Sequence, residues 1–427
     1  MKIFFIVLIF IFKNSFALEF DKLQTNSGIS FWFVKDSSIP IVSVSFSFRG
    51  GSFMESQDKQ GLSNLMTSLL DEGTRDLSAR EFKKAMKING MKLSVSSQKD
   101  KIDGSFQVIS SQISEGFNLF YESLNHPRFE DKEINKVKNQ IISSLKIDQS
   151  DIPTIASNLF NENFFGDHSF ARNTKGTIES IKKINRNDLV NFHKKAFQKS
   201  NLIIGVSGNI GKEEIKKKID LVFSDMENTY EIPKIKRFTS LAQGDKIHKI
   251  STPQTSVFFG HPGFERNNDN FFELRIANYI LGGGGFQSRL YKNIREKRGL
   301  VYSIYTYLLS YETDGILVGG FQTRNESVNK TIKAVKREFD SMRKKGISKE
   351  EFENAKDYFN GSFTRNFTST ISIAKLLQVV QYFKLGEDYF KKREEIINNL
   401  ELEKVNKIVS DIFKGNKLFF MIVGEPE

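Results

Sequence analysis

Cysteine is absent from the 427 residues of this chain. Without a thiol the protein forms no disulfide, carries no lipid on an N-terminal cysteine and offers no thiolate to a metal ion. Histidine is also scarce, and no two copies have the i, i+3 or i, i+4 spacing that places two imidazoles on one helix face. We expect each to be a surface or packing residue; the five are His126, His168, His193, His248 and His261. No Ser-His-Asp pattern is recognisable, so no alternative nucleophile is indicated.

A charge pattern typical of nucleic-acid-binding proteins is missing as well. The chain has 63 Lys and Arg against 51 Asp and Glu, a formal net charge of +12. Its lysines are scattered, often beside acidic residues as in residues 344–351, and no nucleic-acid-binding module is recognisable. We interpret the excess as a basic surface and expect no nucleic acid partner. A basic chamber that prefers acidic or extended peptides remains open.

Long apolar runs are missing beyond the N-terminus. Lys2 precedes an apolar run at residues 3–12, which is short for a membrane span, and Ser15-Phe16-Ala17 then offers small residues for cleavage. This pattern predicts a signal peptide over residues 1–17, with a buried strand as the alternative. We expect the mature protein to begin near Leu18, to be exported, in the bacterial periplasm, and to keep no membrane anchor.

The chain has the pattern of a duplication. In residues 197–208 and again in residues 413–424, Phe precedes Gly at the same spacing, an apolar strand lies between them, and an amphipathic helix comes before. We therefore expect an N-terminal domain at 18–230, a polar, lysine-rich linker at 231–249 and a C-terminal domain at 250–427.

Local patterns predict the elements of each half. Residues 42–48 alternate apolar and serine, as in a strand with one buried face. Residues 93–98 and 105–109 predict a hairpin, and residues 130–145 an amphipathic helix. Strands and helices mix without regular alternation. We expect an α+β fold of two homologous halves, each with helices packed on a mainly antiparallel sheet.

Residues 61–74 keep the spacing of an inverted zinc-site helix, H-x-x-E-H, but not its residues. Asn64 and Ser68 stand at the histidine positions and Thr67 at the glutamate position. An amide and two hydroxyls bind Zn²⁺ poorly, and none of them could activate a metal-bound water as a carboxylate does. We expect Asp71 and Glu72, which follow, to be a solvated helix end.

The strongest local motif runs from residue 281 to 302, where four glycines precede a predicted helix and the run Arg-Glu-Lys-Arg-Gly-Leu-Val-Tyr. Exposed amides at a helix start favour a carbonyl or an anion, so Gly283, Gly284 and Gly285 are candidate substrate-binding residues. A phosphate-binding loop would need a following Gly-Lys-Ser/Thr, which is missing. A flexible turn is the other alternative.

With these motifs the chain resembles the pitrilysin/insulinase family of zinc peptidases over nearly all of its predicted mature length. The similarity rests on residues 61–74 with their closing Gly-Thr, 124–129, 176–181, 188–189, 281–302, 355–356 and 361–363. The family takes its third zinc ligand from a glutamate in a later helix. Here that segment has Ser143 and Ser144, so the resemblance implies a non-catalytic member with no metal of its own and a processing-peptidase-like clamshell fold.

The resemblance also assigns roles to the second half. In active relatives an Arg and a Tyr reach across the chamber from the half opposite the metal; the matching residues are Arg295 and Tyr302, with Arg298 a weaker candidate. Both side chains donate hydrogen bonds to a carbonyl or an oxyanion. From the residues alone, Arg295 on a solvated helix face and Tyr302 half-buried in a strand remain the alternatives.

The resemblance extends to the mitochondrial processing peptidase and implies a split heterodimer. A zinc-bearing paralogue would be the partner and hold the zinc, a peptide would be the substrate, and residues 93–98 would be the edge strand to which relatives add substrate. A structural or peptide-holding protein without a role in proteolysis is the alternative. An unpaired metalloprotease with unusual ligands is a third possibility.

Overall fold

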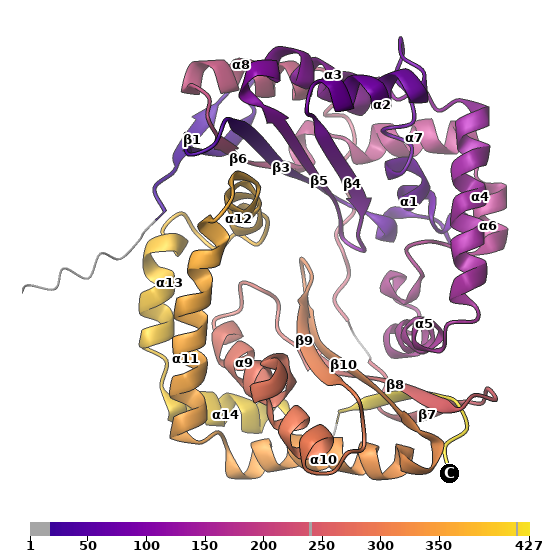
Figure 1. Cartoon of the computed structure of the whole chain (residues 1–427), viewed down its shortest axis with the longest axis vertical. Coiled ribbons are helices and arrows are strands. Elements are labelled where there is room, and N and C mark those ends of the chain that lie inside the picture. Colours follow the sequence, from indigo (N-terminus) through magenta and orange to yellow (C-terminus); the bar gives the residue numbers. More distant parts are fainter. Residues whose placement is uncertain (1–17, 239–240, 416) are drawn as a thin grey trace, which may run out of the picture.

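The computed structural model describes residues 18–238, 241–415 and 417–427, so the predicted signal peptide lies outside the described residues. The first half folds around one sheet (Figure 1). Its elements are β1 (Asp21–Gln24), β2 (Ser30–Lys35), β3 (Ile41–Arg49), α1 (Leu62–Thr67), α2 (Ala79–Ile88), β4 (Lys92–Ser97), β5 (Lys101–Ile109), α3 (Ile113–Asn125), α4 (Asp131–Asp148), α5 (Ile152–Phe165), α6 (Ile178–Lys183), α7 (Arg186–Ala196), β6 (Leu202–Gly208) and α8 (Lys212–Phe223).

The second half repeats this plan around its own sheet. Its elements are β7 (Gly244–His248), β8 (Gln254–Gly263), α9 (Phe271–Asn278), β9 (Ile304–Ser310), β10 (Gly315–Arg324), α10 (Val328–Lys345), α11 (Lys349–Phe363), α12 (Thr370–Tyr382), α13 (Tyr389–Asn398), α14 (Leu402–Ile412) and β11 (Phe419–Val423). The predicted linker at 231–249 is not linker throughout, because its residues 244–248 form β7 and pair with β11.

The two sheets share one topology. The first has the strand order β1-β2-β6-β3-β5-β4 and the second β7-β11-β8-β10-β9. The β2–β6 and β7–β11 pairs are parallel, and the other described pairs are antiparallel. Apart from β1, strand order and direction are therefore the same in both halves. The predicted α+β fold of two homologous halves is confirmed, and so is the β4–β5 hairpin.

Each sheet packs one face on helices of its own half. In the first half, Leu65 of α1, Phe117 of α3 and Leu189 of α7 join the strands in one apolar core. In the second half, Ile276 of α9 and Val335 of α10 do the same. The predicted helix at 130–145 is α4, and its apolar stripe faces the first core. Within the described ranges, no helix combines the length and apolar character that crossing a membrane requires.

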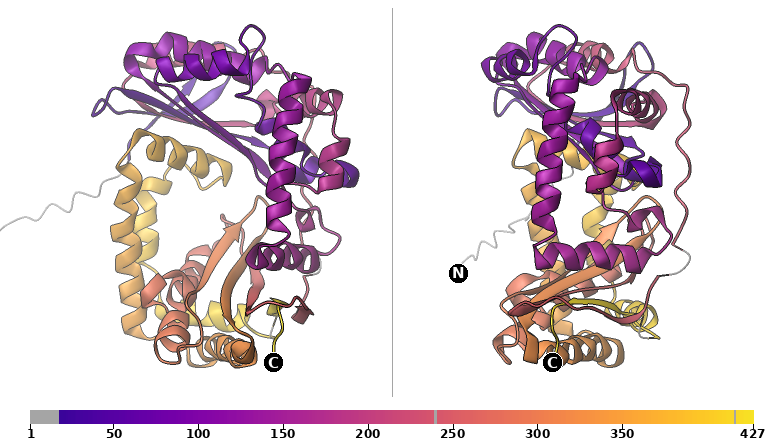
Figure 2. Two further views of the ribbon diagram at one scale, coloured as in Figure 1. Left: turned by 45° about the vertical axis from the view of Figure 1, so that its right-hand side comes forward. Right: turned by 90° about the vertical axis from the view of Figure 1, so that its right-hand side faces the viewer.

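The other face of each sheet packs on a helix from the opposite half. Helix α12 lies against β6 and β3 of the first sheet, and α5 lies against β8 and β11 of the second. Figure 2 shows both helices between the sheets. Glycines allow this close approach: a Cβ on Gly205 would lie 2.2 Å from the carbonyl oxygen of Ala374, and one on Gly260 would lie 2.4 Å from Phe160. The halves therefore complete each other's structure.

The packing of α12 on the first sheet corrects one prediction about β3. The alternation in residues 42–48 predicts one buried face, but both faces are buried, and the serines of the polar face are 0 to 5% exposed. Ser43 Oγ lies 2.7 Å from Thr370 Oγ1, and Gln378 Nε2 donates to Ser47 Oγ. The polar face is dry because α12 covers it and supplies the hydrogen-bond partners.

Substitution at this contact tests the crossed packing. Gly205→Ala places a methyl group against the α12 backbone and should destabilise the protein by about 1–3 kcal/mol, as overpacking does. Gly211→Ala is the matched control, because a Cβ there meets nothing within 4 Å. Urea unfolding of both variants measures the difference. Equal midpoints for the two variants would contradict the assigned contact.

Candidate functional site

The altered metal site uses its hydroxyls within its own turn. Thr67 Oγ1 donates to the Asn64 carbonyl oxygen at 3.1 Å, and Ser68 Oγ donates to the same oxygen at 2.8 Å. Helix α1 ends at Thr67, so Ser68 already belongs to the turn that follows. Thr67 is buried and Ser68 is exposed. Both hydroxyls thus satisfy the backbone of their own turn.

A lysine pairs with one of the two serines that stand at the position of the third ligand. On α4, which contacts α1, Ser143 is exposed and Ser144 Oγ accepts from Lys175 Nζ at 3.1 Å. The same ammonium donates to Asp148 Oδ2 at 2.7 Å. The ion pair with Asp148 offsets the charge of this ammonium, and hydroxyls do not replace imidazole or carboxylate ligands.

The residues present therefore do not fit the zinc ion of active family members. Among the residues that the structure describes, no group of three or more His, Cys, Asp or Glu side chains is placed to hold a metal ion. The buried histidines bind backbone carbonyls: His193 Nε2 lies 2.8 Å from Leu124 O, and His261 Nδ1 lies 2.7 Å from Pro262 O. Burial lowers the pKa of both imidazoles to about 4. They are packing residues.

The expected solvated end of the metal helix is wrong for Glu72. This carboxylate is 7% exposed and accepts from Lys83 Nζ and from Lys136 Nζ, each at 2.6 Å. Burial alone would raise its pKa, but the hydrogen bonds from the two lysines outweigh burial and lower it. Glu72 thus ties α1 to α2 and α4.

A second buried carboxylate, Glu55, holds the start of α1 and was not expected from the sequence. It accepts from Gly61 N at 2.9 Å and from Ser63 N at 2.7 Å. Burial raises the pKa of this carboxyl to about 8, although both hydrogen bonds act in the opposite direction. No local motif marks Glu55, because its partners follow it across an irregular turn.

Arg295 and Tyr302 come together in the second half. Arg295 lies on a π-helical turn, η8 (Tyr291–Glu296), and its guanidinium carbon lies 4.6 Å from the ring centre of Tyr291 and 5.3 Å from that of Tyr302. Tyr302 is 84% exposed, so it is not the half-buried strand residue that the alternative supposed. Arg298 is exposed, and no contact between it and this pair is recorded in the described part of the chain.

The glycine turn differs from the prediction. It follows α9 and a π-helical turn, η6 (Tyr279–Gly283), and its amides are not all available, because Gly284 N donates to Tyr279 O at 2.7 Å. A Cβ on Gly283 would lie 2.7 Å from the side-chain nitrogen of Asn278. Close packing explains these two glycines. Gly285 has a φ of +56° and open space around it, and Gly283 is exposed although it is closely packed on one side.

Both sheets end in a strand with one edge unpaired within the described residues. In the first sheet this is β4, where Ser94 and Ser96 are exposed and the alternate residues Leu93 and Val95 pack toward the core. In the second sheet it is β9, where Tyr305 and Tyr307 are exposed. Each edge offers backbone groups to which an extended peptide can bind.

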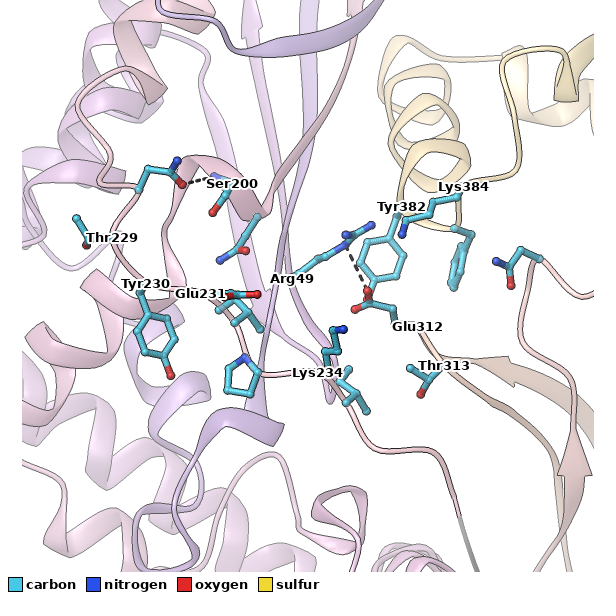
Figure 3. Close-up of a pocket in the computed structure, with 17 residues that line it drawn as sticks. Arg49, Ser200, Thr229, Tyr230, Glu231, Lys234, Glu312, Thr313, Tyr382 and Lys384 are labelled. Carbon is cyan, nitrogen blue, oxygen red and sulfur yellow. Dashed lines mark hydrogen bonds and ion pairs between the residues drawn. The ribbon is translucent and has the colours of Figure 1, made fainter.

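A cavity of about 800 Å³ lies between the halves, beside residues 228–235 (Figure 3). Arg49 from β3 extends toward Glu312, in the turn between β9 and β10, with 3.6 Å between Nε and Oε1. The backbone amide of Glu312 donates to Asp100 Oδ2 at 2.9 Å. Burial raises the pKa of Asp100 to about 6. These contacts join the halves. The cavity is lined by the carboxylates of Glu231 and Glu312 and by several hydroxyls, but no group of three or more His, Cys, Asp or Glu side chains among the described residues is placed to hold a metal ion there.

Comparison with protein families matches both halves. Residues 32–178 match the model described as insulinase, peptidase family M16, and residues 183–359 match the model described as the peptidase M16 inactive domain. The second match begins before α7 of the first half and ends within α11, so the boundary between the matches does not coincide with the division into halves.

Individual relatives extend over most of the chain. The non-peptidase homolog YmxG of Helicobacter pylori is 27% identical over 395 residues, which cover 91% of this chain and 90% of the relative. The crystal structure of a peptidase M16 inactive domain from Pseudomonas fluorescens superposes with a TM-score of 0.91 at 24% identity, covering 96% and 99% of the two chains. A chain of complex III2 from Candida albicans gives 0.79 at 17% identity, covering 95% and 96%.

The raised pKa of Glu55 predicts a dependence of stability on pH. Because the folded pKa of about 8 exceeds the ordinary 4.5, the contribution of this carboxyl to stability is complete below about pH 4.5. It is lost as the pH rises through about 8. Each pKa unit corresponds to about 1.4 kcal/mol. Thermal unfolding between pH 5 and 9 should show a smaller loss of stability for Glu55→Gln than for the unmodified chain.

The exposed Glu213, which is paired only within its own helix, provides the control. Glu213→Gln should keep the original pH dependence. The same dependence in Glu55→Gln as in the unmodified chain would show that Glu55 does not carry the effect.

Proposed function

The chain belongs to peptidase family M16, the insulinase family, as a member without the residues of peptidase catalysis, and we propose that it is the non-catalytic subunit of an exported heterodimeric zinc metallopeptidase. The partner is a paralogue that keeps the H-x-x-E-H ligands and holds the zinc ion. This chain binds no cofactor. It binds peptide and supplies Arg295 and Tyr302 to the active site of the partner.

The geometry of Arg295 and Tyr302 carries this proposal. Two aromatic rings hold the guanidinium, while the phenol extends into solvent and Phe286 nearby is 69% exposed. A guanidinium fixed in this way keeps its N–H edges for a carbonyl oxygen or an oxyanion. Exposed aromatic and arginine side chains are also the residue types enriched at protein interfaces. In a chain without its own metal site, this pair is useful only toward another subunit.

Three further features support parts of the proposal. The unpaired edge of β4 suits an extended peptide. The apolar run at residues 3–12 and the small residues that follow support export to the periplasm. Gly285 and Arg298 are exposed near the same surface and complete the predicted substrate contacts, whereas packing reduces the part that Gly283 and Gly284 can take.

A structural role within a larger assembly is the second candidate. It is supported by the fold shared with a chain of the Candida albicans complex III2. A structural subunit has no need of a half-buried Arg295 held beside an exposed Tyr302, so substitution of this pair distinguishes the two functions.

Metal analysis of the isolated chain is the first test. The mature chain purified alone should contain zinc well below one equivalent and should cleave no peptide library, because its hydroxyls and Lys175 do not form a ligand set. Atomic emission spectroscopy and a fluorescent peptide assay measure the two properties. Stoichiometric zinc together with chelator-sensitive cleavage would end the proposal.

Reconstitution with the zinc-bearing partner, recovered by affinity purification from the native host, is the second test. Arg295→Ala or Tyr302→Phe should lower kcat of the complex by roughly 10²-fold, as expected for losing an oxyanion donor. Lys297→Ala is the matched control, since its ammonium contacts only Asn293 nearby and its kcat should not change. Full activity of the Arg295 and Tyr302 variants would leave only the structural role.

A further inference from the structure

A cavity of about 750 Å³ in the second half is surrounded by positive charge. We call it the arginine pocket and define it by Arg266, Arg275, Arg365 and Arg393. Its walls come from α9, α11, α13 and β9, which lie together in Figure 1, and Lys101 of the first half reaches its rim. No aspartate or glutamate lines it. Four guanidinium groups therefore share one space without a carboxylate among its walls.

Among the described residues, these four arginines also form no ion pairs with residues outside the pocket. The arginine ion pairs recorded in residues 18–238, 241–415 and 417–427 belong to other arginines, such as Arg289 with Glu351. Arg393 is 3% exposed, and its Nε has no hydrogen-bond partner. A buried charge without a counterion is costly, so a cluster of this kind favours an anion as its ligand.

The groups affect one another electrostatically. Burial lowers the pKa of Arg275 to about 10, and repulsion from Arg266 adds to this effect. Burial also lowers the pKa of Arg393. Both directions mean that burial in the folded protein disfavours the charged forms of these two side chains. A bound anion would remove this penalty.

Aromatic rings hold the guanidiniums in place. Arg266 lies 4.2 Å above Phe271, Arg275 lies 4.7 Å above Phe359, and Arg393 lies 3.9 Å above Phe363, each measured to the ring centre. The stacking engages the faces of the guanidiniums and leaves their N–H edges for in-plane acceptors. Arg266 and Arg393 use one nitrogen each, toward Tyr389 Oη and Phe359 O. The side chain of Arg275 has no recorded partner among the described residues.

The position of the pocket indicates the kind of anion. One wall consists of Leu308, Leu309 and Ser310, at the end of the unpaired edge strand β9. An extended peptide added to this edge would direct alternate side chains to one face. Carboxylates on alternate residues would then reach the N–H edges, and the aromatic rings would cover the apolar part of the ligand. The cavity is larger than a single phosphate group needs.

We propose that the arginine pocket binds acidic side chains of an extended peptide that pairs with β9. Acidic extended peptides are thus the substrate class for the peptide-binding part of the proposed function. It does not depend on the zinc-bearing partner, because the site lies within this chain. A failed reconstitution would therefore leave it intact, and a failure of peptide binding here would leave the roles of Arg295 and Tyr302 intact.

Fluorescence anisotropy with the full mature chain tests the proposal. The probes are labelled decapeptides that alternate valine with glutamate, or valine with glutamine. The glutamate peptide should bind at least tenfold more tightly at low salt, and the advantage should shrink at 0.5 M NaCl, because the attraction is electrostatic. Equal affinity of the two peptides would overturn the proposal.

Variants locate the site. Arg275→Gln, and separately the exposed Arg365→Gln, should weaken binding of the glutamate peptide about tenfold and leave binding of the glutamine peptide unchanged. The Arg365 variant keeps the test valid if loss of Arg275 disturbs folding. Arg324→Gln, at a site 70% exposed and outside the pocket, is the matched control and should bind as the unmodified chain does. Unchanged binding by both pocket variants would overturn the assignment.

Two further probes separate the possible ligands. A glutamate peptide N-methylated at alternate amides should lose affinity if its backbone pairs with β9, and undiminished binding would overturn that pairing. Inorganic tripolyphosphate tests a free phosphate ligand. Tripolyphosphate that binds in an Arg275-dependent manner, with no binding of the glutamate peptide, would overturn a peptide as the occupant.

Discussion

The exchange of helices between the halves is the constraint on which the structure depends. Helix α12 closes the polar face of the first sheet and α5 closes the second, so neither sheet is complete within its own half. The contact includes apolar packing of Phe160 against β8 and hydrogen bonds from α12 to Ser43 and Ser47. Because buried hydroxyls need partners, these bonds fix the helix in register as well as in distance. The space between the halves is therefore set by both sheets together.

The sequence was informative wherever a pattern is local. Alternation and helical periodicity predicted the hairpin, α4 and the duplicated α+β halves, and the spacing in residues 61–74 revealed a metal site without ligands. It failed where distant segments decide the outcome. The alternation in β3 predicts that its serines face solvent. They are buried because α12 covers them, and Thr370, the partner of Ser43, lies 327 positions away in the sequence. Glu72 was expected to be solvated, because the two lysines that pair with it lie on other helices and are not its neighbours in the sequence. The arginine pocket has no local motif, since its members are spread from residue 266 to residue 393.

The two candidate sites contrast in how their polar groups are satisfied. In the altered metal site, the hydroxyls of Thr67 and Ser68 bond to a carbonyl one turn away and Lys175 bonds to Ser144, so these hydroxyls serve the local structure. In the second half, Arg295 and the pocket arginines rest on aromatic rings and keep donors unused. The two sites thus differ in their hydrogen bonding: the hydroxyls of the first are engaged locally, and arginines of the second keep donors that no described residue accepts.

The placement of β11 has a consequence for the order of folding. β11 inserts between β7 and β8, which precede it in the sequence by more than 150 residues. The second sheet therefore has no continuous hydrogen bonding until a segment distant in sequence returns to its middle, and the first sheet is covered only when α12 returns to it. Contacts between such distant segments slow folding, because the intervening loops lose entropy on closing before the strands are paired.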